Sequence, residues 1–473
     1  MKYLLWLLLL FPSLPGQSQE GHRLEVKLDN YEMRQLYFAR FMGGNFEYLD
    51  TIERKEEGLF IIEDQQALSP GVYTIVLKPY LKAIQILIDP NNQHLQMQAD
   101  AADIKPQTVQ FSNSEINSQL YQYLGYLPQK QREINEHYKA LKESKGRARK
   151  KRQKQIDKCT KELRDHQESL LKKYTNTWLA LFVQTDLELP FPSFKGSEEE
   201  VQKQQYQFRR THFFDELSLD NAGHIHNPRY FNKLSLYIDR LIPPHPDSAT
   251  AAIVQFLNRL DEGGKLFQYS LDHFVKKYEK PRIVGMDAVF VALIDRYHNE
   301  GKTPWLSEKR RNQLQKSARI YKKILIGKVA PDITVQKRSG QSISLHDIEA
   351  KLTVLFLWRP GCGHCKKASP ILKSLYEKYQ EQGVELLSLC THLGESVKEC
   401  WTYVDENELD DWINAVDPRH RSRFIYLYNA QRTPKIYVLD EDKKILIKDI
   451  SANQLEGLIQ RFLKEAEEAV PNP

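Results

Sequence analysis

The chain has 473 residues, of which 41% are hydrophobic and 27% are charged, and its formal net charge is +6. This length is enough for about three domains, each with its own core. Its five cysteines are far too few for a fold held together throughout by disulfides, and the net charge is too modest to indicate a nucleic-acid partner.

The first residues, MKYLLWLLLLFPSLPGQSQ, follow the pattern of a secretory signal peptide. The apolar stretch from Tyr3 to Phe11 is too short to span a membrane, and Pro12 and Pro15 would break a buried helix. We therefore expect a signal peptide over residues 1–18, no transmembrane segment after its removal, and a location in the periplasm or cell envelope.

Residues 20–108 contain short runs of alternating or continuous apolar side chains, such as RLEVKL and GVYTIVL. Turn residues separate these runs, among them Gly43-Gly44 and Pro70-Gly71. The pattern predicts an all-β module, a small antiparallel sheet or sandwich, with a packing or docking role.

Residues 109–323 change to long helical patterns that begin near Ser114 and Glu115, with a proline-punctuated break near 186–200. The basic stretch KGRARKKRQK at 145–154 is interpreted as a solvated helix face whose charge is balanced by Glu162, Asp165 and Glu168. A surface for nucleic acid or an anionic membrane is the alternative interpretation, and we favour the solvated face over it.

Four histidines, His212, His224, His226 and His245, lie close together in the sequence, but no cysteine or paired acidic ligand has a spacing that completes a metal site. Cys159 lies on a charged helix far from the other cysteines, and we assign it no role. The sequence therefore predicts no metal.

The middle of the chain contains the stretches HFFD, YFNKLSLYIDRL, PPHPDS and GMDAVFVAL. In these stretches it resembles a family of unknown function from Bacteroidetes in which this region precedes a thioredoxin-like domain. The preceding sheet resembles N-terminal modules of such proteins, though less distinctively. This resemblance implies an architecture and assigns no chemistry.

Cys362 and Cys365 stand two residues apart in LFLWRPGCGHCKKASPIL, where a β-prone apolar run ends and a helical pattern begins. Unpaired backbone N–H groups and the helix dipole stabilise an anion at a helix start, so the pKa of Cys362 should fall below the free value of about 8.5. The Cys362 thiolate would attack a disulfide, and Cys365 would then close a disulfide with it and release the partner.

A further set of residues stands around this pair, namely Gly327, Ala330-Pro331-Asp332, Gly340, SLHDI and the dipeptide within Cys362-Gly363-His364-Cys365. With these residues, nearly all of 325–466 resembles the TlpA-like branch of the thioredoxin superfamily, and we expect the corresponding domain over residues 325–473. The resemblance implies a C-terminal α/β thioredoxin-like fold and an exported reductase or isomerase of protein disulfides. It further implies protein thiols and disulfides as substrates, a membrane or periplasmic electron donor, and no cofactor besides the Cys362–Cys365 disulfide.

The same resemblance assigns roles around the cysteines. Gly363 and His364 match the inner dipeptide of protein disulfide isomerase, and a protonated His364 would make the pair more oxidising than that of thioredoxin. Trp358 matches a family tryptophan and Pro370 the proline that kinks the active-site helix. Thr433-Pro434 match a pair whose cis proline faces the disulfide and helps to exclude metal, while the Thr433 backbone binds substrate peptide.

The chain also departs from the family. Phe356 and Ala368 stand where thioredoxin and some TlpA-like reductases have carboxylates, and Gly361 replaces a second tryptophan. Water and His364 remain candidates for the proton acceptor of Cys365. Cys390 and Cys400 form a second disulfide or redox relay, or are two buried thiols.

The predicted protein is thus multidomain, with an all-β module, an α-helical middle and a thioredoxin-like domain. The alternative function is an envelope binding or scaffold protein in which the thioredoxin-like domain is accessory.

Overall fold

The computed structural model describes residues 21–79 and 82–469. The chain divides into two compact units, Met1–Tyr237 and Ile238–Pro473. The predicted signal peptide lies outside the described residues. Among the residues that are described, no helix has both the length and the apolar character needed to cross a membrane.

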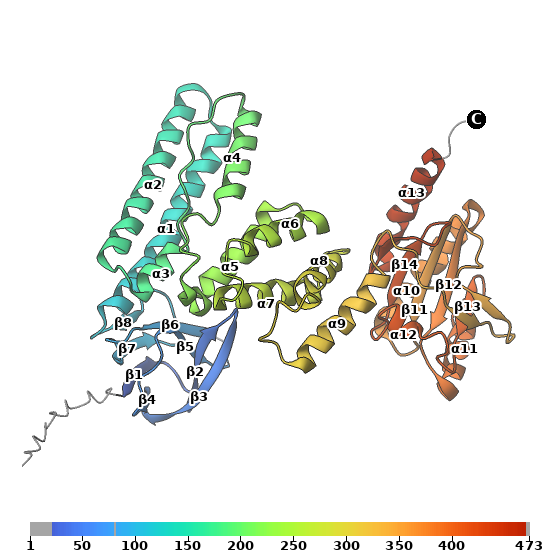
Figure 1. Ribbon diagram of the computed structural model, residues 1–473, viewed down its shortest axis with the longest axis horizontal. Coiled ribbons are helices and arrows are strands. Elements are labelled where there is room, and N and C mark those ends of the chain that lie inside the picture. Colours follow the sequence, from blue (N-terminus) through green and yellow to red (C-terminus); the bar gives the residue numbers. More distant parts are fainter. Residues whose placement is uncertain (1–20, 80–81, 470–473) are drawn as a thin grey trace, which may run out of the picture. The chain divides into compact units, whose positions relative to one another are not determined.

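The first unit begins with a sheet of eight strands in the order β6-β5-β2-β3-β4-β1-β7-β8 (Figure 1). Alternation explains its buried face, since Leu24, Val26 and Leu28 of β1 point into the core. The predicted all-β module is confirmed, although β1 and β7 run parallel. The strands are β1 (His22–Asp29), β2 (Gln35–Met42), β3 (Asn45–Glu56), β4 (Leu59–Asp64), β5 (Gly71–Leu77), β6 (Lys82–Ile88), β7 (His94–Asp100) and β8 (Val109–Phe111).

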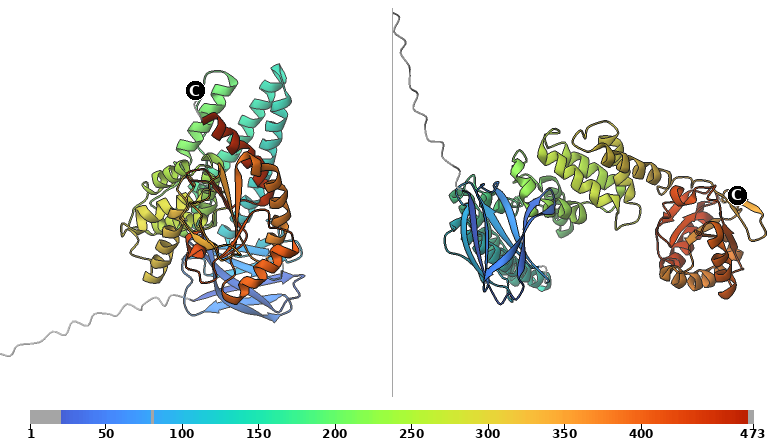
Figure 2. Two further views of the ribbon diagram at one scale, coloured as in Figure 1. Left: turned by 90° about the vertical axis from the view of Figure 1, so that its right-hand side faces the viewer. Right: turned by 90° about the horizontal axis from the view of Figure 1, so that it is seen from below.

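Helices complete the first unit. α1 (Glu115–Glu143) begins at the predicted start signal, where the Ser114 side chain accepts a hydrogen bond from the Asn117 backbone N–H. It pairs with α2 (Gly146–Lys173) in a long hairpin (Figure 2). Leu120 and Tyr123 of α1 belong to the same apolar core as the sheet. The remaining elements are α3 (Trp178–Gln184), α4 (Glu198–His212), η1 (Ala222–His226) and α5 (Pro228–Leu236).

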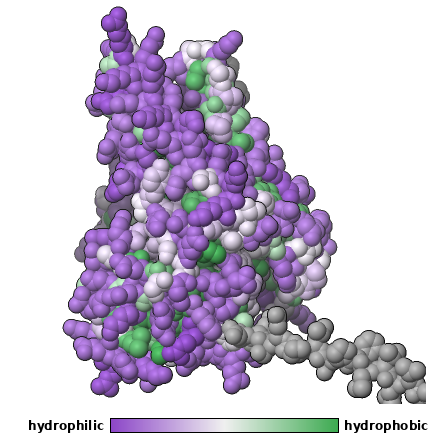
Figure 3. Space-filling view, turned by 90° about the vertical axis from the view of Figure 1, so that its left-hand side faces the viewer, coloured by the Kyte–Doolittle hydropathy of each residue, from purple (hydrophilic) through white to green (hydrophobic). Residues whose placement is uncertain are grey.

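The basic stretch 145–154 is mostly exposed and lies where α2 begins. Hydrophilic side chains cover the face of the first unit's helical hairpin seen in Figure 3. The prediction that Glu162, Asp165 and Glu168 balance the charge of this stretch is wrong, because all three form ion pairs with other basic residues. Two of these pairs join residues four apart on α2, which face each other on the helix surface, and the third joins α2 to α1. The pairs are Glu162 with Lys130, Asp165 with Lys161, Glu168 with Arg164 and, from the basic stretch, Arg149 with Glu198.

The second unit starts with a helical bundle held by aromatic contacts, such as that between Phe290 and Tyr321, whose ring centres lie 5.8 Å apart. Its elements are η2 (Tyr237–Leu241), which begins at the last residue of the first unit, α6 (Pro246–Leu257), α7 (Lys265–Glu279), α8 (Asp287–Leu293), η3 (Ile294–His298) and α9 (Glu308–Lys323).

A seven-stranded sheet in the order β10-β9-β13-β12-β11-β14-β15 follows in the second unit. β11, β12 and β13 pair in parallel, and β14 is antiparallel to β11. The neighbouring side chains Phe356 and Leu357 of β11 belong to two different apolar clusters, one on each face of the sheet. This is expected for a sheet that is covered on both faces. The strands are β9 (Thr334–Gln336), β10 (Ser342–Ser344), β11 (Leu352–Trp358), β12 (Val384–Cys390), β13 (Ile413–Val416), β14 (Lys435–Leu439) and β15 (Ile445–Lys448). The helices are α10 (Gly363–Tyr379), η4 (Gln380–Gln382), η5 (Gly394–Ser396), α11 (Val397–Glu406), α12 (Phe424–Leu427) and α13 (Ala452–Ala469).

Candidate active site

The two cysteines of the CGHC motif lie where β11 gives way to α10. All seven residues of β11 are buried, and the chain then turns at Gly361, whose φ of +78° is readily adopted only by glycine. Cys362 is the N-cap of α10, and its sulfur accepts a hydrogen bond from the Cys365 backbone N–H at 3.3 Å. The predicted position of Cys362 directly before the first helical residue is confirmed.

The two thiols have different environments. Cys362 is partly exposed, whereas Cys365 is 0% exposed. Burial acts to raise the pKa of Cys362, but hydrogen bonding with Cys365, Thr433 and the His364 backbone outweighs it and sets its pKa below the usual value. Burial raises the pKa of Cys365 to about 12, and the neighbouring Cys362 adds to the rise. At neutral pH the accessible sulfur is therefore the better nucleophile and the buried one keeps its proton.

The loop before β14 closes over the cysteines. The Thr433-Pro434 peptide bond is cis, as predicted, and the Cys362 thiol donates a hydrogen bond to the Thr433 carbonyl at 3.4 Å. The Thr433 hydroxyl is also buried, and Thr433 helps to lower the pKa of Cys362. These contacts bring the predicted Thr433-Pro434 pair and the CGHC motif together across 71 residues of sequence.

The other predicted site residues lie in different environments around the cysteines. His364 is exposed, and it is its backbone N–H that acts on the pKa of Cys362. Gly363 is the first residue of α10, and Pro370 lies inside the helix. Trp358 is 2% exposed and packs on Tyr403, with ring centres 5.0 Å apart.

The positions without carboxylates are apolar and buried, since Phe356 is 1% and Ala368 5% exposed. Behind Cys365 lies a hydroxyl chain, in which Ser369 donates to the Cys365 carbonyl at 3.1 Å and Tyr403 donates to the Ser369 hydroxyl at 3.3 Å. In the part of the chain that is described, no acidic side chain forms a hydrogen bond with either thiol of the motif.

Cys390 and Cys400 form a disulfide, which excludes the alternative of two buried free thiols. Cys390 ends β12 and stands opposite Trp358 of β11, while Cys400 lies on α11. Both cysteines are 1% exposed. Because both sulfurs are buried, thiols in solution have little access to the bond. The disulfide fastens α11 to β12, next to the strand that carries the active site.

The clustered histidines of the first unit do not come together as one site. His224 is buried against Tyr230, with ring centres 5.2 Å apart, and burial lowers its pKa to about 4. The His226 ring forms a hydrogen bond with the Phe41 carbonyl at 3.2 Å. Both rings serve packing within the first unit.

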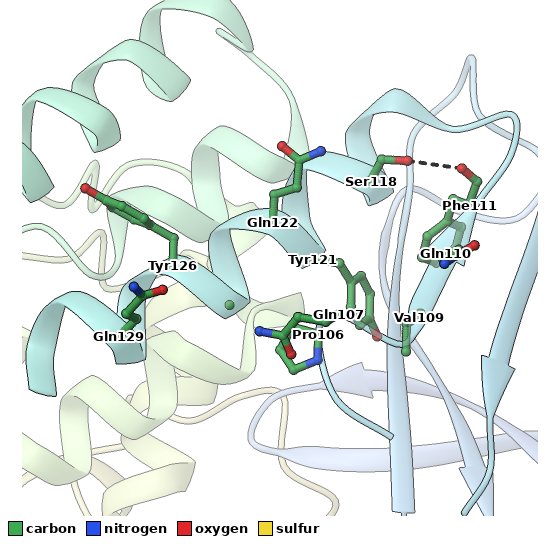
Figure 4. A pocket seen from close by; sticks show the side chains of 11 residues that line it. Pro106, Gln107, Val109, Gln110, Phe111, Ser118, Tyr121, Gln122, Tyr126 and Gln129 are labelled. Atoms are coloured by element: carbon green, nitrogen blue, oxygen red, sulfur yellow. Dashed lines mark hydrogen bonds between the residues drawn. The ribbon is translucent and has the colours of Figure 1, made fainter. Parts of the chain in front are cut away.

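A groove of about 600 Å³ lies between β8 and α1 in the first unit (Figure 4). Its lining has amide and aromatic side chains and no cysteine or charged group, so it offers binding contacts without thiol chemistry. The Tyr121 hydroxyl is already engaged, because it donates to the Gln85 carbonyl at 3.1 Å. The lining residues are Pro106, Gln107, Val109, Gln110, Phe111, Ser118, Tyr121, Gln122, Gly125, Tyr126 and Gln129.

Comparison with known proteins identifies the C-terminal region. Residues 326–447 match the AhpC/TSA family. The thiol-disulfide oxidoreductase ResA of Bacillus cereus is 33% identical over 144 residues, which cover 30% of this chain and 80% of the relative. The thioredoxin-like protein YneN of Bacillus subtilis is 28% identical over 124 residues, which cover 26% of this chain and 69% of the relative.

Solved structures of similar proteins include a thioredoxin-like protein from Bacteroides caccae, 22% identical, with a TM-score of 0.48 over 58% of this chain and 98% of that chain. A domain of a possible thiol-disulfide isomerase from Cytophaga hutchinsonii is 28% identical, with a TM-score of 0.29 over 30% of this chain and 97% of that chain. From its sequence relatives, the chain belongs to the thioredoxin-like thiol-disulfide oxidoreductases.

Proposed function

We propose that this protein is an exported enzyme that reduces or isomerises protein disulfides through Cys362 and Cys365. The observation that carries the proposal is the opposite shift of the two pKa values, downward for the accessible Cys362 and upward for the buried Cys365. This asymmetry gives each sulfur a separate role. The signal-like residues 1–18 support a periplasmic location.

The reaction starts with the Cys362 thiolate. It attacks one sulfur of a substrate disulfide, the substrate S–S bond breaks, and the other substrate sulfur leaves as a thiolate that takes up a proton. Cys365 then loses its proton and attacks the Cys362 sulfur, which forms the Cys362–Cys365 disulfide and releases the second substrate thiol. The substrate gains two electrons and the dithiol loses two, which an electron donor must return in each cycle.

In isomerisation the substrate itself completes the exchange. A second substrate thiol attacks the mixed disulfide at the substrate sulfur, and Cys362 leaves as the thiolate without net oxidation. The lowered pKa of Cys362 stabilises its thiolate as a leaving group and therefore favours this release. The backbone at Thr433 and the exposed His364 would face the substrate in both reactions.

The proton of Cys365 needs an acceptor in each reductive cycle. The apolar side chains of Phe356 and Ala368 provide none, so water or the His364 imidazole takes the proton in this proposal.

Insulin reduction by dithiothreitol and reactivation of scrambled ribonuclease test the proposed activity. The chain should accelerate both, and Cys362→Ser should abolish both accelerations. A wild-type chain that accelerates neither reaction would contradict the proposal.

The uncharged groove beside β8 supports a second candidate function, in which the first unit binds an uncharged segment of an envelope partner. In this case the thioredoxin-like domain is accessory. The two candidates differ in the insulin and ribonuclease assays, because a scaffold protein accelerates neither.

A further inference from the structure

The helical hairpin of the first unit brings together three side chains of different metal-binding types. Glu133 and His137 stand four residues apart on α1, and Cys159 faces them from α2. A carboxylate oxygen, a ring nitrogen and the sulfur of these residues all lie within 4.8 Å of one another. The Cys159 sulfur lies 3.3 Å from Oε1 of Glu133.

We propose that Glu133, His137 and Cys159 bind a zinc ion. Zinc accepts thiolate, imidazole and carboxylate ligands in one tetrahedral site. Zinc–ligand bonds of about 2.0 to 2.3 Å place neighbouring ligand atoms about 3.3 to 3.6 Å apart. The Cys159–Glu133 pair already has this separation, and the His137 ring nitrogen lies within 4.8 Å of both ligand atoms. The fourth position is left to water.

The neighbouring charges suit a divalent cation. Lys130 holds the other carboxylate oxygen of Glu133 at 3.0 Å, while Glu162 offsets the lysine charge at 2.6 Å. A ligating carboxylate is commonly oriented by such an outer partner. When zinc binds, the Cys159 thiol releases one proton to solvent, and the thiolate and carboxylate together balance the two charges of the ion without any electron transfer.

Solvent reaches the cluster of Glu133, His137 and Cys159, and an ion bound there would link α1 to α2. Cys159 is 5% exposed, but the Glu133 side chain is 42% exposed and opens the cluster to solvent. α2 buries only four of its 28 residues, Ile156, Cys159, Gln167 and Leu170. A bound ion would therefore fasten two helices that share little apolar surface.

The test uses the full chain with Cys362→Ser and Cys365→Ser, so that the CGHC motif cannot bind metal. Zinc is titrated calorimetrically, and cobalt is used as a spectroscopic probe of thiolate ligation. We expect one ion per chain and a thiolate-to-cobalt charge-transfer band. Adding Cys159→Ser should remove the band, and His137→Gln should weaken zinc binding by at least about 10-fold.

Glu136→Gln is the matched control, because Glu136 is an exposed carboxylate on the same helix outside the cluster. It should leave both measurements unchanged. Equal zinc uptake with and without Cys159, or the absence of a charge-transfer band in the parent, would overturn the proposal. So would an unchanged affinity in His137→Gln with an unchanged helical circular dichroism spectrum.

Discussion

Lys448 of β15 and Asp287 of α8 form a buried ion pair, with Nζ 2.5 Å from Oδ2. Lys448 is 1% and Asp287 4% exposed, and the lysine also donates to the Ile324 carbonyl at 2.5 Å. The pair joins residues that are 161 apart in the sequence and lie in the same unit. It fastens the helical bundle of the second unit to the sheet that carries the CGHC motif.

Lys448→Met should lower the free energy of unfolding of the second unit by about 3 to 5 kcal/mol, because it leaves the Asp287 carboxylate buried and unpaired. The double variant Lys448→Met/Asp287→Leu should recover most of this loss, since it removes both charges. Urea denaturation followed by circular dichroism measures both. A double variant as unstable as the single one would show that the pair does more than neutralise charge.

The alkylation rate of Cys362 should rise with pH around a midpoint below about 8.5, the pKa of a free thiol, because its pKa is lowered. Cys365 should stay unreactive through this range, since burial raises its pKa to about 12. Iodoacetamide labelling of each single Cys→Ser variant separates the two profiles. Equal midpoints would contradict the assigned roles.

The same shifts predict how the stability of the reduced protein depends on pH. Between the lowered pKa of Cys362 and about 8.5, the unfolded chain binds more protons at this residue than the folded one, so Cys362 makes stability rise with pH. Above about 8.5 the unfolded chain loses the Cys365 proton that the folded chain retains, so Cys365 makes stability fall. Cys365→Ser should make this fall smaller in the reduced protein, as measured by urea denaturation.

Cys365→Ser should accumulate partner proteins bound to Cys362, because the residue that resolves the mixed disulfide is missing. Non-reducing gels of cell extracts should show high-mass species that disappear with reductant. Cys362→Ser should trap almost none. Equal trapping by the two variants would mean that Cys390 or Cys400 takes part in the chemistry despite their burial in a disulfide.

His364→Pro should make the dithiol more reducing, because it removes both the imidazole and the backbone N–H that lowers the pKa of Cys362. The potential should move from a value near that of disulfide isomerase, about −180 mV, toward that of thioredoxin, about −270 mV. Equilibration with glutathione measures it. His364→Gln keeps the N–H and removes only the imidazole, so it isolates the contribution of the ring, and an unchanged potential in His364→Pro would exclude a tuning role.

The sequence by itself determined the local features. The CGHC spacing at the junction of an apolar run and a helical pattern placed Cys362 at a helix start, and the Ser114 signal marked the start of α1. Both are short-range consequences of hydrogen bonding at helix ends. The resemblance to thioredoxin-like proteins added the cis Thr433-Pro434 bond.

Only the tertiary structure decided which distant residues meet. It joined Cys390 to Cys400, set Lys448 against Asp287, and brought Cys159 beside Glu133 and His137. The predicted partners of the basic stretch failed mainly for a local reason, because Asp165 and Glu168 pair with basic residues four positions away on α2. Only the pair of Glu162 with Lys130 depends on the packing of α1 against α2. Helix packing and strand order determine these long-range contacts, and neither can be read from the spacing of residues within a single motif.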